Sequence, residues 1–372
     1  MLTTPLATPL IAVLLTGSWF DCTIAVDFLL QRRPCVAIWV ATTPAPPLVR
    51  SAPLGGFFYV WRVSLVKPPF VKAAISVEAQ LQRLVDRGMV VGDHDEAIRY
   101  LHRIGYYRLS GYTLPFQNGG GGADHHVFTN PVTFEDVLDR YIFDRKLRLL
   151  LMDAIERIEV SVRAGLSNNV AERNGSHWFT DANIFNTGFD HIEYIREIKR
   201  QICFNNPDKQ TVFIRHYYDN YSAPNMPPCW MVFEAVSFGV ISKTVEHVKK
   251  DEFKELCAHY GIPHVVLVSW LHTISYVRNL CAHHSRVWNR VLTIKPAVAK
   301  RHKEDLQDNS RMYAVAIVLQ ILLGRIAPDN HWATRLKLLF EEHPAVPLAA
   351  MGFPDDWVTK PVWGLPPPAD EA

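Results

Sequence analysis

The sequence has little cysteine and no strong excess of charge. Its six cysteines form no CxxC pair and no dense framework, so we expect free thiols in a reducing compartment rather than a secreted fold stapled by disulfides. Lys and Arg total 39 against 37 Asp and Glu, so total charge indicates no class of partner. Hydrophobic residues make up 48% of the 372 positions, which excludes a wholly disordered or fibrous chain. We expect a cytoplasmic globular protein of one to three domains.

The N-terminal segment lacks the pattern of a signal peptide and of a membrane span. Residues 1–20 carry no charge, whereas a signal peptide begins with a basic region. Pro5 and Pro9 precede an apolar run at 10–15 that is too short to cross a membrane. We therefore expect residues 1–66 to be a non-globular or spurious leader, produced for instance by a misassigned start. An export or anchor segment is the alternative.

Strand-like alternation is also scarce, and helical periodicity dominates from Ser76 onward. Ser76 and Asp93 are expected to cap two helices that end at Gly88 and Gly105. Gly119–Gly122 predicts a plain loop, because the Gly-Lys-Ser/Thr of a phosphate-binding loop does not follow it. The fold class is therefore mainly α, with 204–228 as a connection and further helices predicted over 134–170, 229–248, 250–260, 264–292, 307–324 and 330–342.

The longest predicted helix, 134–170, has one apolar face and one charged face. Glu159 can pair with Arg163 four residues later, and we expect the whole charged face to be solvated. The predicted core face contains Phe143, Leu147, Leu150, Leu151, Ile155, Ile158 and Val162. The predicted solvent face contains Asp144, Arg145, Arg148, Glu156, Arg157, Glu159 and Arg163.

Asp and Glu are absent from a 48-residue window, Leu256–Lys303, whose last part holds seven Lys or Arg and three His. Such a window predicts a local positive field suited to phosphate. In the predicted helix 264–292, Arg278 borders a polar stripe. His283 is expected to face solvent, whereas His284 falls in the apolar arc and is expected to be packed. The stripe contains Asn279, His283, Arg286 and Arg290.

Histidine, arginine and asparagine on one exposed stripe suit the cleavage of RNA without a metal. A neutral imidazole can take the proton from a ribose 2′-hydroxyl or protonate the leaving oxygen. An arginine offers a planar charged fork to the phosphate as negative charge develops. Zinc is the competing hypothesis, because Cys257-Ala-His259 and Cys281-Ala-His283 are two C-x-H pairs. Residues two apart on a helix point in nearly opposite directions, so we expect no metal and no other cofactor.

The region from about Lys67 to Trp363 resembles the Abi family of bacterial abortive-infection (phage-resistance) proteins, the AbiD/AbiF-like group. These proteins are placed among the HEPN-type proteins, which are helical and often metal-independent ribonucleases. Several motifs carry the resemblance in order: Lys67-Pro68-Pro69, Arg87-Gly88, Tyr106–Tyr112, Phe143–Arg148, Ile155–Glu159, Trp230 with Glu234, Ser237-Phe238-Gly239, Arg278-Asn279, Ala282–Arg286, Trp288–Arg290, Met351–Pro354 and Trp357.

The resemblance implies a helical HEPN-like bundle and the residues of a candidate catalytic site. The HEPN motif, an Arg followed four to six residues later by His, maps onto Arg278, Asn279 and His283, although counting alone also admits His284. Family members pair their motif helices across a two-fold axis, which implies a homodimer with a composite site. An acidic helper is also implied, and the sequence leaves Glu156, Glu159 and Glu234 open. The expected organisation is a leader at 1–66, an N-terminal helical subdomain at 67–130, a HEPN-like domain at 131–358 and a disordered tail at 359–372.

The predicted function is that of a phage-defence endoribonuclease, a toxin-like protein normally held silent by an antitoxin or awaiting a phage-derived trigger. His283 would be the acid–base catalyst, Arg278 would stabilise the transition state and Asn279 would position it. Arg286 and Arg290 would bind RNA phosphates. The alternative is a non-catalytic HEPN-like module that binds RNA, a nucleotide or a partner. Nucleotidyl transfer is disfavoured, because the sequence shows no paired carboxylates for two metals.

Overall fold

The structure is a computed structural model that describes residues 69–117, 126–129 and 131–365. The expected leader and Gly119–Gly122 lie outside the described residues. The fold is mainly helical, as predicted, and the strands of the described residues are β1 (Met89–Val90) and β2 (Val132–Thr133), which pair in parallel. The chain divides into two compact units at Phe134, which ends the first, and Glu135, which begins the second.

The described part of the first unit contains three α-helices, α2 (Val77–Asp86), α3 (His94–Ile104) and α4 (Tyr106–Thr113). Both predicted caps are confirmed. Ser76 Oγ accepts a hydrogen bond from the backbone N–H of Ala79, and Asp93 Oδ1 accepts one from Glu96 at 2.8 Å. These caps fix where the two helices begin, so their apolar faces meet in a small core formed by Leu81, Leu84, Ala97, Leu101, Leu109 and Tyr112.

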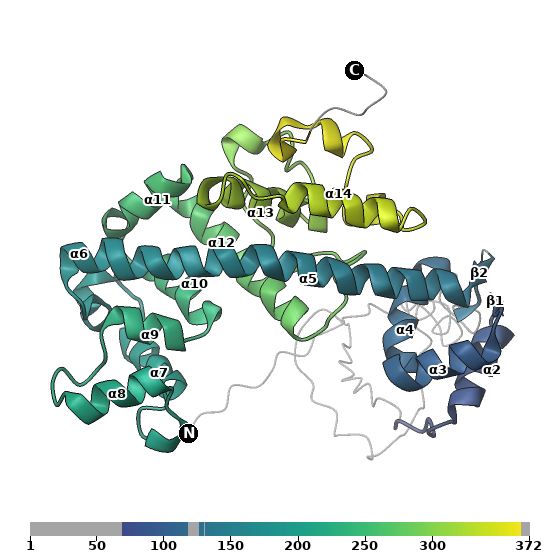
Figure 1. The fold of residues 1–372 in the computed structure, drawn as a ribbon, viewed down its shortest axis with the longest axis horizontal. Helices are drawn as coiled ribbons and strands as arrows, with labels where there is room; N and C mark the ends of the chain where they lie inside the picture. Colours follow the sequence, from purple (N-terminus) through teal and green to yellow (C-terminus); the bar gives the residue numbers. More distant parts are fainter. Residues whose placement is uncertain (1–68, 118–125, 130, 366–372) are drawn as a thin grey trace, which may run out of the picture. The chain divides into compact units, whose positions relative to one another are not determined.

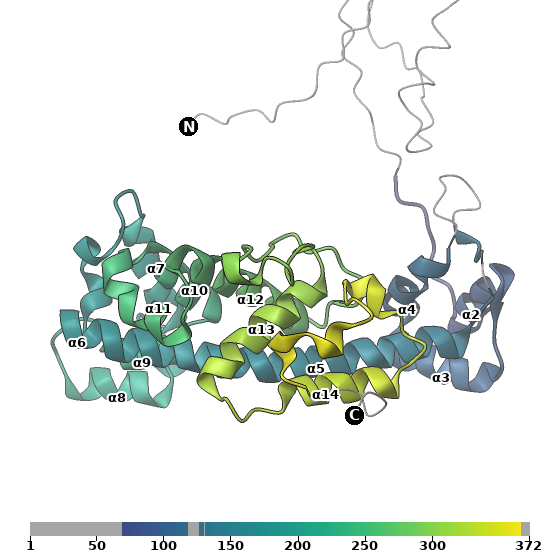
Figure 2. The ribbon, with the colours of Figure 1, turned by 90° about the horizontal axis from the view of Figure 1, so that it is seen from above.

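The second unit is built along one long helix (Figures 1 and 2). Helix α5 (Phe134–Gly165) continues through a π-helical turn, Leu166–Val170, into α6 (Ala171–Asn174). Its predicted core face is buried, apart from Leu150, which is half-buried. The predicted solvent face is wrong in part, because Asp144, Arg148 and Arg163 are buried. Charged residues at helical spacing do not reveal a second packed surface, and these three are buried by chain from much later in the sequence.

Eight further α-helices of the described residues complete the second unit. Helix α10 packs against α12, and α12 also contacts α11 and α13. The predicted connection at 204–228 is wrong at α8, where a polar helix buries only a narrow stripe of Ile214 and Tyr217. The helices are α7 (His191–Gln201), α8 (Val212–Asn220), α9 (Cys229–Ala235), α10 (Phe238–His247), α11 (Lys254–Tyr260), α12 (His264–Ala282), α13 (Met312–Ile326) and α14 (Trp332–Glu342).

Helix α12 ends at Ala282, so the predicted helix 264–292 is too long. His284 has a left-handed backbone, with φ of 56°. Its N–H donates to the carbonyl oxygen of Cys281 at 3.0 Å, and the N–H of Ser285 donates to Leu280 at 2.8 Å. This pair of bonds is a Schellman motif, which usually carries glycine at the left-handed position. The sequence has histidine there, so no glycine announces the end of the helix.

A buried acid on α5 holds the segment that follows α12. Asp144 Oδ1 accepts hydrogen bonds from the backbone N–H groups of Val287 at 3.0 Å and Trp288 at 2.6 Å. Asp144 also forms a buried ion pair with Arg148 one turn along α5. The Arg148 Nη1 lies 3.5 Å from the carbonyl oxygen of Ser285. Two charges of the Phe143–Arg148 motif therefore fix the course of the chain directly after the candidate histidine.

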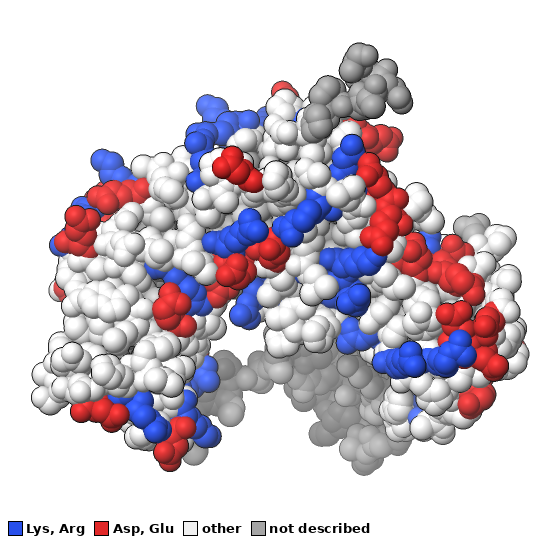
Figure 3. Space-filling view, viewed as in Figure 1, with Lys and Arg blue, Asp and Glu red and all other residues white. Residues whose placement is uncertain are grey.

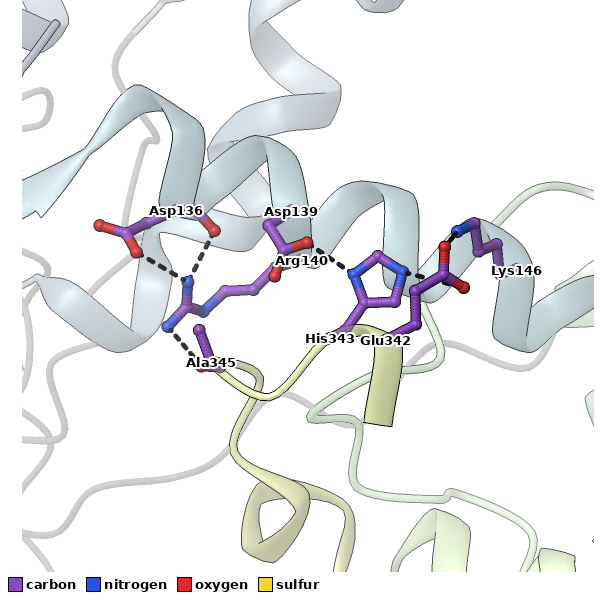
Figure 4. Close-up of polar contacts among 7 residues, drawn as sticks. All are labelled: Asp136, Asp139, Arg140, Lys146, Glu342, His343 and Ala345. Carbon is purple, nitrogen blue, oxygen red and sulfur yellow. Dashed lines mark hydrogen bonds and ion pairs between the residues drawn. The ribbon is translucent and has the colours of Figure 1, made fainter. Parts of the chain in front are cut away.

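A polar cluster joins α14 to α5 (Figure 4). His343 Nδ1 lies 2.6 Å from Asp139 Oδ1, and Lys146 forms an ion pair with Glu342. The His343 ring is buried and packs edge-on against Phe143. An Asp–His pair is a common catalytic unit, but the Nε2 of this ring is buried, makes no hydrogen bond among the described residues and lies 3.9 Å from Glu342 Oε2. The cluster is therefore a structural contact between the two helices.

Part of the expected disordered tail is folded. Residues Pro361–Trp363 form a 3₁₀ turn, and the Trp363 side chain is 2% exposed in a cluster of aromatic rings with Phe353 and Trp357. The region after residue 365 lies outside the described residues. Within the described chain, every helix is too short or too polar to span a lipid bilayer.

Candidate functional site

The predicted arginine of the motif enters a pocket between three helices of the second unit. Arg278 on α12 lines a pocket of about 310 Å³ together with residues of α5 and with Glu234 on α9. The three acidic residues that the sequence left open, Glu156, Glu159 and Glu234, all line this pocket. It therefore brings Arg278 next to every candidate helper at once. The remaining lining residues are Met152, Ile155, Val160 and Arg163.

Glu159 is the carboxylate that binds the arginines of this pocket. Its Oε2 lies 3.8 Å from Arg278 Nε, and its Oε1 forms an ion pair with Arg163. Arg163 Nη2 also donates to the carbonyl oxygen of Val236 at 2.9 Å, at the end of α9. The predicted Glu159–Arg163 pair is thus confirmed. One carboxylate between two guanidinium groups holds α5, α9 and α12 around the pocket and orients Arg278.

Two guanidinium nitrogens of the pocket residues lack hydrogen-bond acceptors. Arg163 Nη1 and Arg278 Nε are buried and make no hydrogen bond within the described residues, although Arg278 Nε lies 3.8 Å from Glu159 Oε2. The Arg163 side chain is 8% exposed, and that of Arg278 is 34% exposed. Buried donors without acceptors are costly, so each such group calls for a partner. Within the described chain, the carboxylates of Glu156 and Glu234 also have no ion pair or hydrogen bond to protein, and both residues are exposed.

His283 and Asn279 are exposed at the end of α12, as predicted for both. His283 is the C-cap of α12, and its N–H donates to the carbonyl oxygen of Asn279 at 3.0 Å. The two side chains therefore lie one turn apart on the same exposed surface. Neither residue lines the pocket that Arg278 enters.

The predicted stripe does not continue beyond His283, because the helix ends there. Arg286 and Arg290 are half-buried in the following segment, and Arg290 Nε donates to the carbonyl oxygen of Arg286 at 2.7 Å. The prediction that His284 is packed is wrong, because the left-handed turn at this residue leaves it exposed. Both adjacent histidines face solvent, and only His283 keeps the helical relation to Asn279.

In the folded structure, acidic residues from outside the Leu256–Lys303 window lie next to residues of the window. Glu159 lies against Arg278, and Asp144 lies beneath Val287 and Trp288. On the face drawn in Figure 3, Lys and Arg side chains lie among Asp and Glu side chains rather than in one positive field. The positive charge of the window is therefore partly neutralised by acids that α5 supplies.

The two C-x-H pairs are poorly placed for a shared zinc ion. Cys281 is buried, whereas His283 is exposed. Burial raises the pKa of the Cys281 thiol to about 12 and that of Cys257 to about 11, which disfavours the thiolate that zinc needs. Within the described residues, His, Cys, Asp and Glu side chains form no group of three that could hold a metal.

A second pocket, of about 330 Å³, lies at the start of α12 and contains none of the motif residues. Its walls are mostly apolar, with two cations at the edge, so it offers no acid–base group. Its lining residues are Ile262, Pro263, Val266, Ala299, Lys300 and Arg301. The pocket of Arg278 is therefore the candidate functional site.

Sequence reasoning missed Arg163 as a residue of this site. The only indication in the sequence was Glu159, four residues before Arg163. That spacing predicts an ion pair on the helix surface. The sequence motifs assigned no site role to Trp230. Its spacing of four from Glu234 nevertheless places both residues on one face of α9.

The chain was compared with known families and proteins. A model of the Abi-like protein family matches residues 99–289, which is more than half of the chain and includes α5, the candidate pocket and the Arg278–His283 motif. No curated protein and no solved structure gives a significant match. The chain therefore belongs to the Abi-like protein family, which is associated with abortive infection, a defence against phage.

Proposed function

We propose that this protein is a metal-independent endoribonuclease of phage defence. The observation that carries the proposal is the end of α12, where exposed His283 lies one turn from exposed Asn279 and Arg278 enters a pocket beside Glu159. An exposed imidazole can remove the proton from the ribose 2′-hydroxyl, which then attacks the adjacent phosphorus. The products of this attack are a 2′,3′-cyclic phosphate and a free 5′-hydroxyl.

The guanidinium of Arg278 is the group that stabilises the charged transition state. Glu159 lies on its Nε side, so this contact orients the fork while part of the side chain stays exposed. A preorganised cation of this kind stabilises charge that develops on phosphate oxygens. Asn279 positions the phosphate or the imidazole from the same exposed turn. Arg286 and Arg290 follow directly and supply contacts to neighbouring phosphates.

A homodimer with a composite site is part of the proposal, as the family resemblance implies. Large apolar side chains are exposed on α5 and α12, among them Leu149, Val160 and Val265. Such side chains support an interface with a second copy. Light scattering from the purified 42.4 kDa chain should give about twice that mass. A monomer at micromolar concentration would contradict this part.

The alternative function is a non-catalytic module that binds RNA, a nucleotide or a partner. A plaque assay separates the two functions. Cells that express the His283→Ala variant should be as sensitive to phage as cells without the protein, because the acid–base group is gone. The His272→Ala variant is the matched control, since His272 is another exposed histidine of α12 outside the motif. Full protection by His283→Ala would favour the binding module.

A further inference from the structure

Trp230 differs from the other tryptophans of the described chain. Its side chain is 49% exposed, whereas the six others there are between 0 and 4% exposed. Helix α9 buries Cys229, Val232 and Phe233 on its inner face. Trp230 therefore lies on the outer face of α9, where about half of a large apolar residue stays exposed to solvent.

Trp230 adjoins the pocket through Glu234. The two residues are four apart on α9, so their side chains are neighbours on one face, about 6 Å apart along the helix. Glu234 lines the pocket, together with Arg278 from α12. Trp230 does not itself line the pocket, but it lies one helical turn from Glu234 and thus beside a pocket that contains the motif arginine.

The pocket offers donors and acceptors that protein groups leave unpaired. Arg163 Nη1 and Arg278 Nε are buried N–H groups without an acceptor among the described residues. Glu156 and Glu234 are carboxylates without a protein donor in the described chain. Met152, Ile155 and Val160 supply apolar wall between these polar groups. A fitting ligand is planar, partly apolar, and carries both a hydrogen-bond acceptor and a donor.

We propose that this pocket is a nucleobase subsite, in which Trp230 stacks on one unpaired base and Glu234 accepts a hydrogen bond from the exocyclic amino group of that base. The inference rests on the proposed function, because it assumes an RNA ligand. Aromatic stacking holds unpaired bases of any sequence. A carboxylate accepts from an amino group such as cytosine N4, and an arginine donates to a base carbonyl.

The two acids without a protein partner in the described chain disfavour phosphate on their side of the pocket. Glu156 and Glu234 would repel a phosphate group, whereas they attract the amino edge of a base. The backbone of the RNA is left to the partly exposed guanidinium of Arg278 and to the exposed Asn279 and His283 at the end of α12. Uracil has a carbonyl where cytosine has the amino group. Its carbonyl oxygen and the Glu234 carboxylate are both acceptors, so they form no hydrogen bond. The subsite therefore selects cytosine over uracil.

The test uses the full chain with His283→Ala, which prevents cleavage, and chelator in the buffer. The probes are single-stranded oligo(C) and oligo(U) RNA of equal length, with affinity measured by fluorescence anisotropy at fixed salt. Oligo(C) should bind more tightly than oligo(U). Adding Trp230→Leu should weaken the binding of oligo(C) by about 5- to 100-fold, the range for loss of one stacked base. Trp230→Phe should retain most of the affinity.

Two further variants separate stacking from other effects. Glu234→Gln should erase the preference for oligo(C), because the amide can donate to the uracil carbonyl. Glu246→Gln is the matched control, since Glu246 is an exposed acid of α10 outside the pocket, and it should leave the preference unchanged. Circular dichroism should show the same folded state in all variants, because Trp230 and Glu234 are surface residues.

Three results would overturn the subsite. The first is equal binding of oligo(C) and oligo(U) by the parent, and the second is unchanged affinity in Trp230→Leu. The third is conversion of a dimer to a monomer by Trp230→Leu, which would make Trp230 an interface residue.

Failure of the proposed function gives a different result. If the wild-type chain leaves RNA intact while binding still depends on Trp230 and Glu234, the subsite stands without the nuclease. If Trp230→Leu changes neither binding nor cleavage while His283→Ala abolishes cleavage, only the subsite is wrong.

Discussion

A single buried carboxylate determines where the chain goes after the candidate histidine. Asp144 accepts two backbone N–H groups of the following segment and faces Arg148 in the interior. Hydrogen bonds to a charged acceptor are stronger than neutral ones, and a buried charge that loses its partner is costly. The segment around His283 therefore depends on a residue of α5 that lies about 140 positions earlier.

Removing the charge of Asp144 should destabilise the protein strongly. We expect Asp144→Asn to lower the free energy of unfolding by about 3–5 kcal/mol, because Arg148 stays buried without its countercharge. Urea denaturation followed by circular dichroism measures this. The matched control is Asp153→Asn on the same helix, where the partly exposed pairs with Arg157 and Arg335 should contribute about 1 kcal/mol or less. Equal effects of the two substitutions would contradict the role given to Asp144.

At the scale of the element, the end of α12 decides which of the two adjacent histidines keeps its helical position relative to Asn279. His284 takes the left-handed conformation that closes the helix, so its side chain leaves the helical pattern. His283 is the helix C-cap and keeps its position relative to Asn279. The site geometry depends on this one turn of backbone.

Two substitutions at His284 test the turn directly. His284→Val and His284→Gly both remove the imidazole, so the difference between them reports only on backbone conformation. A left-handed backbone costs a β-branched residue about 1–2 kcal/mol more than glycine. We therefore expect the valine variant to be less stable by about that amount in thermal or urea unfolding. Equal stability would mean that residue 284 is not left-handed in solution.

The elements predicted well from the sequence are those with an explicit signal. Ser76 and Asp93 are capping residues in the sequence and in the structure. The apolar period of α5 likewise predicts its buried face, because one side of a long helix must meet the core. The end of α12 had no such signal, since histidine stands where glycine is usual.

The residues of the candidate motif were predictable from the sequence, but the pocket that Arg278 lines was not. The helical stripe and the family resemblance together pointed to Arg278, Asn279 and His283, and solvent exposure of the last two followed from the helical pattern. The pocket around Arg278 depends on α5 and α9, which are distant in sequence, so periodicity within one helix could not locate it. For the same reason the pattern predicts a solvated Arg163, whereas the residue is buried and bonded to Val236 and Glu159.

For the whole molecule, two half-buried histidines predict instability in acid. Burial lowers the pKa of His264, at the start of α12, and that of His302. The unfolded chain therefore takes up these protons at a higher pH than the folded chain does. The stabilisation that these two histidines contribute is complete above their unfolded pKa of about 6.5. It is lost as the pH falls below that value.

The expected result is a melting temperature that falls between pH 7 and pH 5. The His264→Gln and His302→Gln double variant should lose less over the same range, because glutamine does not titrate. Differential scanning fluorimetry at constant ionic strength measures both curves. Parallel curves for the wild type and the double variant would contradict the lowered pKa values.

The central claim concerns the chemistry at the end of α12, and one measurement tests it most directly. Purified wild-type protein is incubated with tRNA or mRNA in excess EDTA, beside His283→Ala and His272→Ala. We predict that the wild type and His272→Ala produce fragments with 2′,3′-cyclic phosphate ends, detected by mass spectrometry, and that His283→Ala leaves the RNA intact. Cleavage by His283→Ala at the wild-type rate would contradict the account.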